Sequence, residues 1–288
     1  MRNFLIIPIL FIFLASCSNS ENFDIPSISK LEKLEEHSNQ FIKGIYSYDN
    51  GIHVAIGFGI ANSIMVVGEG GNIIIDTTDD VSQAKEVLSE FQKINQNPIK
   101  AIIYTHNHGD HVFGASEFYN AQEEKPLVIA HSTTAEKVEK ILGIINPIIT
   151  IRSGKMFGTN LDEGELINVG LGPYLSAGRS SPGYIAPTMT FEKELKLEIA
   201  GHKVELYHAP GETDDQIFVW FPELSALMPG DNFYTTFPNL YTIRGTSHRD
   251  VIGWVNSIDK MRSLDPQYLF PSHTCLLYTS DAADETCR

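Results

Sequence analysis

The first third of the chain alternates apolar and polar positions with a period of two, which predicts β-strands. The pattern covers residues 41–48, 53–58 and 62–77, and Gly70–Gly71 followed by Asn72 predicts a hairpin turn in the last of these. Over residues 79–94 apolar side chains recur at helical spacing, with Asp79 or Asp80 available as the N-cap. Residues 100–106 are a β-branched run typical of a buried strand. This order of elements predicts an α/β crossover.

The second half of the chain repeats this pattern. Residues 194–199 and 203–209 alternate about Ala200–Gly201 as a hairpin, and residues 216–221 and 225–231 read as two apolar strands. Residues 248–264 have the period of an amphipathic helix, and residues 267–273 are a last strand. The segment from Gly143 to Pro187 is rich in glycine and proline, which predicts a long ordered loop or lid. We therefore expect two β-plus-α halves that pack sheet to sheet with helices outside.

Composition and charge limit the kinds of molecule that this protein is expected to bind. The chain has 288 residues, of which 42% are hydrophobic, and this is enough to fill a substantial core. The formal net charge of -15 would repel the phosphates of nucleic acids and anionic lipids over most of the exterior. We expect no nucleic-acid partner, and a small anionic substrate would require positive charge that is concentrated locally.

The N-terminus is predicted to be a targeting segment. Arg2 precedes an apolar stretch from Phe4 to Leu14, which is too short to span a bilayer as a stable helix. The stretch ends in Leu-Ala-Ser-Cys and resembles a bacterial lipoprotein signal, so that residues 1–16 would be removed and Cys17 lipidated. Membrane contact would then occur only through this lipid, at the periplasmic or outer surface of the cell envelope. The alternative is an ordinary secretory peptide with a chance cysteine.

The remaining boundaries follow from composition. Residues 17–40 are polar and are predicted to be a tether with one short helix at 29–37, and the main domain is predicted over residues 41–274. Residues 275–288 resemble the translation of a transposon-end sequencing adapter, so we exclude them from the expected fold. Cys275 and Cys287 lie in that tail, so disulfides contribute nothing to the body. The native C-terminal end is then expected to be missing.

Three histidines and an aspartate gather at the end of the predicted strand 100–106. His106 and His108 are two residues apart, so in an extended segment both side chains can face one ion. Asp110 and His111 follow Gly109 at the turn and can face a second ion. Imidazole and carboxylate are ligands that zinc accepts, and the carboxyl end of a strand is where open α/β sheets place ligands. The spacing therefore predicts a metal site.

The motif His-X-His-X-Asp-His after a hydrophobic strand is the signature of the metallo-β-lactamase superfamily, which this chain resembles. The resemblance implies the α/β fold of that superfamily, an αββα sandwich. It also implies a hydrolase with two zinc ions and a shared hydroxide, since two ions lower the pKa of bound water. One ion would bind His106, His108 and Glu212, the other would bind Asp110, His111 and His273, and Asp231 would bridge them, with Asp110 and Asp231 as the expected catalytic residues.

Glu212 stands where most members of the superfamily carry a histidine, and this changes the charge of the centre. If Asp110, Glu212, Asp231 and a hydroxide are all negative, together they offset the charge of two divalent ions. Such a centre is neutral and holds an anion weakly, so a cation must come from elsewhere if the substrate is anionic.

Residues 237–250 resemble the segment that follows the metal ligands in alkyl and aryl sulfatases of this superfamily. There an asparagine and an arginine hold the sulfate, and by resemblance Asn239 and Arg244, with Tyr241 between them, are the expected substrate-binding residues. A guanidinium and a carboxamide suit a tetrahedral oxyanion, because several fixed N–H donors can meet several oxygens. The resemblance implies hydrolysis of alkyl or aryl sulfate esters.

Other interpretations stay open. The same centre would also serve another ester class, a lactone, β-lactam or phosphoester, although Glu212 disfavours a β-lactam. A non-catalytic binding lipoprotein is a third hypothesis. Manganese and iron are alternatives to zinc because the ligand set does not select one metal, and homodimer formation is undecided. Among the other histidines, contact with the metal ligands is considered for His131 and His248, whereas surface or packing positions are expected for His37, His53, His202 and His208.

Overall fold

The computed structural model describes residues 30–162, 164–176, 182–236, 238–274 and 277–278. The predicted signal peptide, Cys17 and most of the 275–288 tail lie outside these residues, so predictions about them stay predictions. Within the described part of the chain, no helix combines the length and the apolar character needed to cross a membrane.

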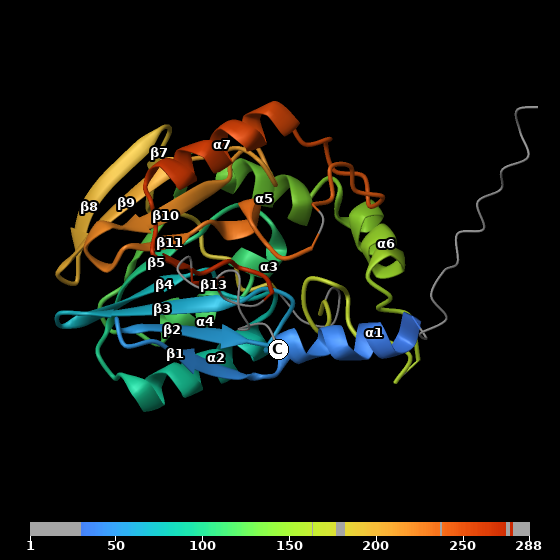
Figure 1. Cartoon of the computed structure of the whole chain (residues 1–288), viewed down its shortest axis with the longest axis horizontal. Helices are drawn as coiled ribbons and strands as arrows, with labels where there is room; N and C mark the ends of the chain where they lie inside the picture. Colours follow the sequence, from blue (N-terminus) through green and yellow to red (C-terminus); the bar gives the residue numbers. More distant parts are fainter. Residues whose placement is uncertain (1–29, 163, 177–181, 237, 275–276, 279–288) are drawn as a thin grey trace, which may run out of the picture.

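Two sheets and the helices outside them form four layers, which confirms the predicted αββα sandwich (Figure 1). From top to bottom of that view lie α7, the second sheet, the first sheet and α2. The helices are α1 (Lys30–His37), α2 (Val81–Ile94), α3 (Gly109–Val112), α4 (Ala115–Asn120), α5 (Thr134–Leu142), α6 (Asn146–Met156) and α7 (Val251–Ser263), with 3₁₀ turns η1 (Ser38–Phe41), η2 (Pro222–Leu224) and η3 (Gly230–Asn232).

The first sheet has seven strands in chain order, antiparallel from β1 to β4 and parallel from β4 to β7. They are β1 (Gly44–Ser47), β2 (Ile52–Ile56), β3 (Ser63–Gly68), β4 (Gly71–Ile75), β5 (Ile99–Ile103), β6 (Leu127–His131) and β7 (Met189–Phe191). Because β4 and β5 run parallel, their carboxyl ends meet at one edge of the sheet.

The second sheet has the order β13-β12-β11-β10-β9-β8. Its strands are β8 (Glu194–Ile199), β9 (His202–His208), β10 (Ile217–Phe221), β11 (Ala226–Met228), β12 (Tyr268–Leu269) and β13 (Leu277–Tyr278). Both predicted hairpins are present: β3 pairs with β4, and β8 pairs with β9 through Ala200 and Gly201. Both turn residues have positive φ, 50° and 79°, as a two-residue turn between twisted strands requires.

Side chains that alternate along each strand divide the core into layers. On β3, Ile64 and Val66 pack between the two sheets, whereas Met65 belongs to the cluster beneath α2. On β10, Val219 packs between the sheets and Trp220 packs toward α7. Both faces of the central strands are therefore apolar, which explains why their sequences read as continuous hydrophobic runs.

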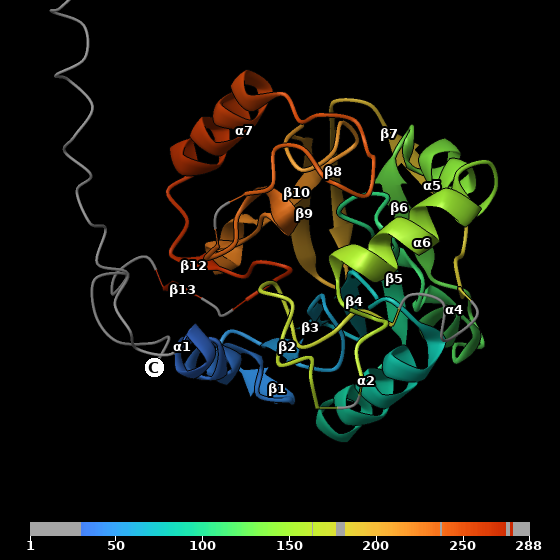
Figure 2. The same ribbon diagram turned by 90° about the vertical axis from the view of Figure 1, so that its right-hand side faces the viewer.

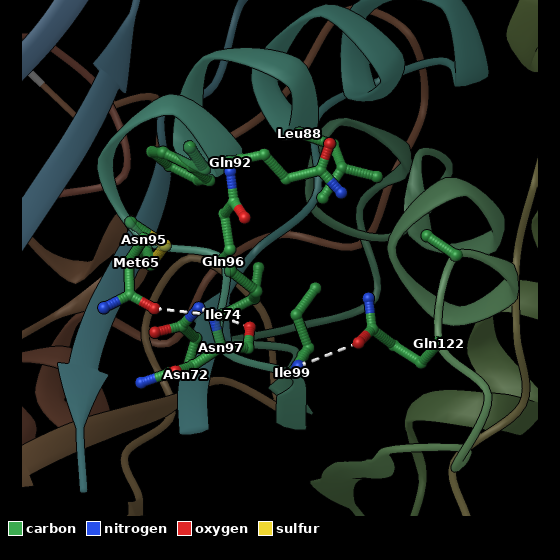
Figure 3. A pocket seen from close by; sticks show the side chains of 12 residues that line it. Met65, Asn72, Ile74, Leu88, Gln92, Asn95, Gln96, Asn97, Ile99 and Gln122 are labelled. Atoms are coloured by element: carbon green, nitrogen blue, oxygen red, sulfur yellow. Dashed lines mark hydrogen bonds between the residues drawn. The ribbon is translucent and has the colours of Figure 1, made fainter. Parts of the chain in front are cut away.

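Helix α2 covers the first sheet as its spacing predicts. Ala84, Val87, Leu88 and Phe91 are buried, but Ile94 is 41% exposed at the last turn. The connection from α2 to β5 lies at the sheet edge opposite the metal motif and borders a cavity of about 280 Å³ (Figure 3). Side-chain amides there replace missing backbone partners: the Asn97 N–H donates to Asn95 (2.8 Å) and the Ile99 N–H to Gln122 (3.0 Å).

Helix α6 corrects the prediction of an irregular segment between Gly143 and Pro187. Its sequence contains β-branched residues, glycine and Pro147, all unfavourable inside a helix. Pro147 lies in the first turn, where its missing N–H is not needed, and Ser153 and Gly154 are buried. In Figure 2, which faces the right-hand side of Figure 1, α6 crosses in front of the strands. Tertiary packing has therefore overridden weak local propensity.

Helix α1 confirms the short helix predicted at the end of the polar segment, and it contacts the main domain. The Asn168 amide donates to the Leu34 carbonyl (2.8 Å), and the His37 ring nitrogen Nε2 lies 2.9 Å from the Gly170 carbonyl oxygen. The boundary of the predicted tether at residue 40 stays a prediction.

The N-cap of α2 provides a test of the fold. The Asp80 carboxylate accepts from the Ser82 and Gln83 N–H groups (2.6 and 3.0 Å) and from the Ser82 hydroxyl (2.6 Å). Burial raises its pKa, but these hydrogen bonds, that of the hydroxyl first, hold the pKa below the usual value. We predict that Asp80→Ala lowers the free energy of unfolding by about 1–2 kcal/mol. Because the folded-state pKa is the lower one, this difference should be full above pH ~4 and decline as the pH falls further.

Chemical denaturation at a series of pH values measures this difference. The control is Glu90→Ala on the same helix, which removes a surface ion pair with Lys93 and should change stability by less than about 0.5 kcal/mol. Equal stability of Asp80→Ala and the control at neutral pH would contradict the capping role.

Candidate metal centre

The motif at the end of β5 is held in place by the neighbouring strands. The chain leaves β5 through Tyr104 and Thr105, both buried. The Thr105 N–H donates to Asp76 Oδ1 (2.8 Å), and its carbonyl accepts from the Ile217 N–H of β10 (2.8 Å). His106 and Asn107 follow in a bend, His108 is in extended backbone, and α3 begins at Gly109. The motif therefore joins both sheets at one edge.

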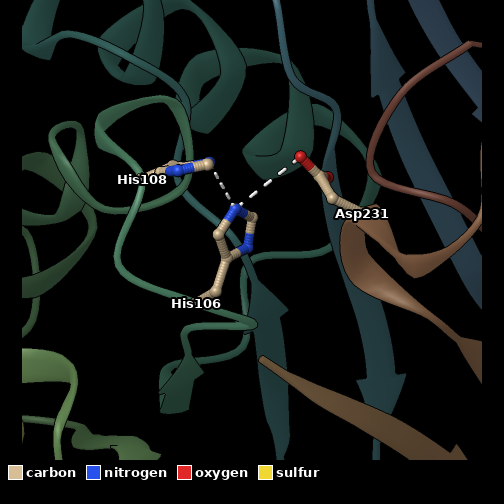
Figure 4. A group of neighbouring side chains, drawn as sticks. All are labelled: His106, His108 and Asp231. Atoms are coloured by element: carbon tan, nitrogen blue, oxygen red, sulfur yellow. Dashed lines mark hydrogen bonds and ion pairs between the residues drawn. The ribbon is translucent and has the colours of Figure 1, made fainter. Parts of the chain in front are cut away.

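His106, His108 and Asp231 form one group of metal-ligating atoms (Figure 4). The His106 Nε2 lies 2.9 Å from His108 Nδ1 and 3.6 Å from Asp231 Oδ2. Glu212 adjoins this group, with its Oε1 3.6 Å from His108 Nδ1. The three residues of the group come from the β5 loop and from η3 after β11, so only the packed sheets bring them together.

Asp110, His111 and His273 form a second group. The His111 and His273 Nε2 atoms each lie 3.4 Å from Asp110 Oδ2, and they lie 3.4 and 3.0 Å from Asp231 Oδ2. One oxygen of Asp231 is therefore close to ring nitrogens of both groups. The structure brings all seven predicted ligands into one region, with Asp231 between the two groups and Glu212 beside the first; the predicted division of the ligands between two ions stays a prediction.

The unpaired atoms of these residues fit a cation. His111 Nε2, Glu212 Oε2 and Asp231 Oδ1 are buried and have no hydrogen-bond partner among the residues that the structure describes. Buried polar atoms rarely stay unpaired because each costs about 1–3 kcal/mol. Imidazole nitrogens and carboxylate oxygens that converge within 4.8 Å of one another are also a donor set for zinc and related divalent ions. The residues present therefore fit divalent metal ions.

Electrostatics divide the histidines into two kinds. Burial lowers the pKa of His106 well below its usual value, and burial together with the Arg244 guanidinium lowers that of His108 to about 3. Burial would also lower the pKa of His111 and His273, but the carboxylates of Asp231 and Asp110 raise both, that of His273 to about 10. The carboxylates thus attract positive charge to the place where the two groups meet.

Outer contacts orient the histidine rings, and the sequence analysis missed most of them. His111 Nδ1 lies 2.7 Å from Asp76 Oδ2, and His273 Nδ1 lies 2.8 Å from the Ile60 carbonyl oxygen. Asp76 also accepts from the Ser272 hydroxyl (2.8 Å) and has a positive φ of 57°, a strained conformation outside glycine. The sequence feature that could have identified Asp76 is its position directly after β4, because the end of β4 lies next to the end of β5.

A second missed residue is Arg249, which pairs with Glu212. Both side chains are buried, 5% and 7% exposed, and the Arg249 guanidinium contacts Glu212 Oε1. Burial and the neighbouring Asp231 raise the pKa of Glu212 to about 8, and Arg249 opposes this shift. The sequence gives no local signal for this pair, because the two residues lie in different loops.

A cavity of about 380 Å³ opens beside the ligands. Ligands from both groups form the polar end of the cavity together with Arg244. The Arg244 Nη2 lies 3.3 Å from His108 Nε2. The apolar wall of the cavity comes from the loop between β2 and β3, from the residue after α3, from the end of α5, from α6 and from the loop after α6. It consists of Ile60, Phe113, Ile141, Leu142, Ile149, Phe157, Leu171, Leu175 and Pro182.

The structure brings only one of the three predicted substrate-binding residues to this cavity. Arg244 lines it, whereas the described lining residues include neither Asn239 nor Tyr241, and the Tyr241 side chain is 70% exposed. A role for Asn239 and Tyr241 in sulfate binding stays a prediction. His131 stacks on His208 with ring centroids 4.2 Å apart, and His248 is exposed.

Comparison with known proteins agrees with this geometry. The sequence model of the Metallo-beta-lactamase superfamily matches residues 56–273. A linear primary-alkylsulfatase of Pseudomonas sp. is 39% identical over 230 residues, 78% of this chain and 43% of that protein. An alkyl/aryl-sulfatase of Saccharomyces cerevisiae is 26% identical over 232 residues, 77% of this chain and 35% of that protein. This chain therefore spans less than half the length of these curated relatives.

Solved structures share the fold. A stereoselective inverting sec-alkylsulfatase from Pseudomonas sp. superposes with a TM-score of 0.77 at 23% identity, covering 84% of this chain and 40% of that one. A metallo-β-lactamase from Pontibacter korlensis superposes with a TM-score of 0.54 at 17% identity, covering 82% of this chain and 94% of that one. The fold, the ligand motif and the match over residues 56–273 lead to one conclusion: the chain belongs to the metallo-β-lactamase superfamily.

Proposed function

We propose that this domain hydrolyses alkyl or aryl sulfate esters with two zinc ions held by the seven ligands. One observation carries the proposal: the Arg244 guanidinium lies 3.3 Å from a metal ligand, His108, at the polar end of a cavity whose other wall is apolar. An ester with an anionic head and an apolar tail matches both ends of such a cavity. The similarity to alkylsulfatases supports this choice among ester classes.

Charge at the polar end favours an anionic head. The Glu212 carboxylate is paired with Arg249, so its charge is already compensated by the protein. With two divalent ions and a hydroxide, the carboxylates of Asp110 and Asp231 then leave net positive charge, to which Arg244 adds. The site is therefore locally cationic although the chain as a whole carries -15.

In this proposal Arg244 recognises the sulfate group as well as attracting it. Its Nη1 lies 4.0 Å from the Met156 sulfur, and its guanidinium carbon lies 5.9 Å from the centre of the Phe157 ring. These contacts restrict the long side chain, so less conformational entropy is lost when it binds an anion. A guanidinium has several fixed N–H donors, and these match the oxygens of a tetrahedral anion.

The remaining residues prepare the substrate for attack by water. Two bound divalent ions would supply an acidified water molecule and offset the charge of the sulfate. The ligands from both sheets fix this end of the cavity, while α6 and the following loop cover the apolar group of the ester. Hydrolysis consumes one water and releases an alcohol and inorganic sulfate.

The proposed location rests on the predicted N-terminal signal alone. We propose that the protein is a lipid-anchored envelope lipoprotein, which would expose the domain to sulfate esters outside the cytoplasm. The support is the apolar segment that ends at Cys17, and labelling with radioactive palmitate in a bacterial host tests it. We expect the parent protein to be labelled and Cys17→Ser to lose the label. An unlabelled parent protein would contradict the proposal.

The Asp76 contact with His111 generates a prediction on metal affinity. We expect Asp76→Ala to weaken zinc binding by about 10- to 100-fold, because the His111 ring loses the partner that orients it. Competition with a chromophoric chelator measures this affinity. Asp80→Ala is the matched control, since it also removes a buried aspartate but contacts no ligand. Equal zinc affinity in the two variants would speak against the proposed centre.

Arg244→Ala should lower kcat/KM for a medium-chain alkyl sulfate by about 10- to 100-fold, as expected for the loss of one charge-assisted hydrogen bond or more. Steady-state assays of released sulfate give the value. Arg262→Ala is the control, because Arg262 is 79% exposed and pairs only at the surface with Asp259. Turnover that is unchanged in Arg244→Ala would eliminate the assigned sulfate contact.

The apolar wall predicts a dependence on chain length. Each methylene that enters the cavity should raise kcat/KM about fourfold, from ~0.8 kcal/mol of burial, until the cavity is filled. Ile149→Ser, on the cavity side of α6, should reduce this increment. Ile148→Ser, on the same helix but 56% exposed, should not. A flat response to chain length in the parent protein would rule out burial of the tail in this cavity.

A further inference from the structure

Arg249 makes contacts on two sides that no catalytic role explains. Its side chain is buried; one guanidinium nitrogen contacts Glu212 Oε1 and the other contacts the carbonyl oxygen of Asn239. Its backbone N–H donates to the Leu240 carbonyl (3.0 Å). Arg249 thus contacts a predicted metal ligand and joins the two ends of the loop formed by residues 239–249.

We call residues 239–249 the arginine loop. Arg249 closes its base, and inside it the Gly245 N–H donates to the Thr242 carbonyl (3.0 Å) and the Thr246 N–H to the Thr242 hydroxyl (3.2 Å). Arg244 lies at the turn and reaches the cavity. The position of Arg244 therefore depends on how the base of the loop is fixed.

Glu212 is held from two directions. Its backbone N–H donates to Asn232 Oδ1 (3.1 Å), next to Asp231, and its Oε1 is occupied by Arg249. The other oxygen, Oε2, is buried and finds no partner in the described part of the chain. The ion pair therefore leaves one defined oxygen for a cation. A buried guanidinium and carboxylate both need a partner, so neither is easily rotated away.

We propose that Arg249 is a positioning residue that couples metal binding at Glu212 to the placement of Arg244. Metal binding fixes the Glu212 carboxylate, the carboxylate fixes the Arg249 guanidinium, and the guanidinium fixes the base of the arginine loop. By linkage, an anion bound to Arg244 strengthens metal binding at Glu212. The inference rests on the metal centre of the proposed function, but it does not depend on which ester is hydrolysed.

A purely structural role for Arg249 would have different consequences. A residue that only stabilises the fold would, when replaced, lower stability and loosen many regions whether or not zinc is present. A coupling residue makes the order of one loop depend on zinc. Hydrogen exchange of the arginine loop, compared between the zinc-loaded and chelator-treated full chain, therefore separates the two roles.

The experiment compares the parent protein with Arg249→Met, Arg249→Lys and the surface control Arg262→Met. In the parent, zinc should slow exchange of the amides at Gly245, Thr246 and Arg249. In Arg249→Met, one zinc equivalent should bind about 10- to 100-fold more weakly, and zinc should no longer protect the loop. Inorganic sulfate, the anion probe, should tighten zinc binding in the parent but not in Arg249→Met.

Arg249→Lys should separate the two contacts. A single ammonium can pair with Glu212 but cannot also form the planar fork to Asn239. We therefore expect this variant to recover zinc affinity more than loop protection. Should Arg249→Met fail to fold, this variant and the zinc dependence in the parent still decide the question.

Three results would overturn the coupling. The first is hydrogen exchange of the arginine loop that zinc does not slow in the parent. The second is protection of this loop by zinc that persists in Arg249→Met. The third is a loss of zinc affinity and loop protection in Arg262→Met equal to that in Arg249→Met. Failure of the proposed function is distinguishable, because it would appear as absent turnover of every alkyl and aryl sulfate in a parent protein whose loop zinc still protects.

Discussion

Compensation of buried charge is the constraint on which this structure depends. Asp110, Glu212 and Asp231 carry carboxylates into the space where the two sheets meet, and their side chains are only 3–17% exposed. An unpaired buried carboxylate costs more than nearby apolar contacts can offset, so each requires a partner of opposite charge or a proton. The imidazoles, Arg249 and the proposed metal ions meet that requirement, and they must come from distant segments.

The two sheets supply the rigidity that this arrangement needs. The ends of β4 and β5 provide Asp76 and the histidine motif, while the turns after β9 and β11 provide Glu212 and Asp231. Apolar side chains on both faces of the central strands fix the distance between the sheets. Because a packed core resists small displacements, the ligand atoms stay within a few ångströms of one another.

The proposed substrate specificity depends on segments outside the two sheets. Helices α5 and α6 and the loop after α6 are not strands of either sheet, yet they contribute most of the cavity lining outside the ligands, and Arg244 lines the cavity from a separate loop. A common metal-binding frame can thus serve different substrates when only these segments change. The Glu212–Arg249 pair connects the two parts, because one partner belongs to the frame and the other to the loop.

The sequence by itself determined what is local or follows a period. Strand alternation, a cap at Asp79 or Asp80, the turn at Ala200–Gly201 and the spacing from His106 to His111 are all readable from neighbouring residues, and chain order within a known motif set predicted the later ligands. Periodicity failed for α6, where packing against the site outweighs its poor helix propensity.

Only the tertiary structure decided which charges are paired. Neither Asp76 nor Arg249 belongs to a sequence motif. Their roles arise because folding brings Asp76 into contact with His111 and Arg249 into contact with Glu212. It also placed Arg244, and not Tyr241, in the cavity. The physical reason is that a sequence pattern reflects the surroundings of a single helix or strand, whereas the partner of a buried charge depends on how separate elements pack.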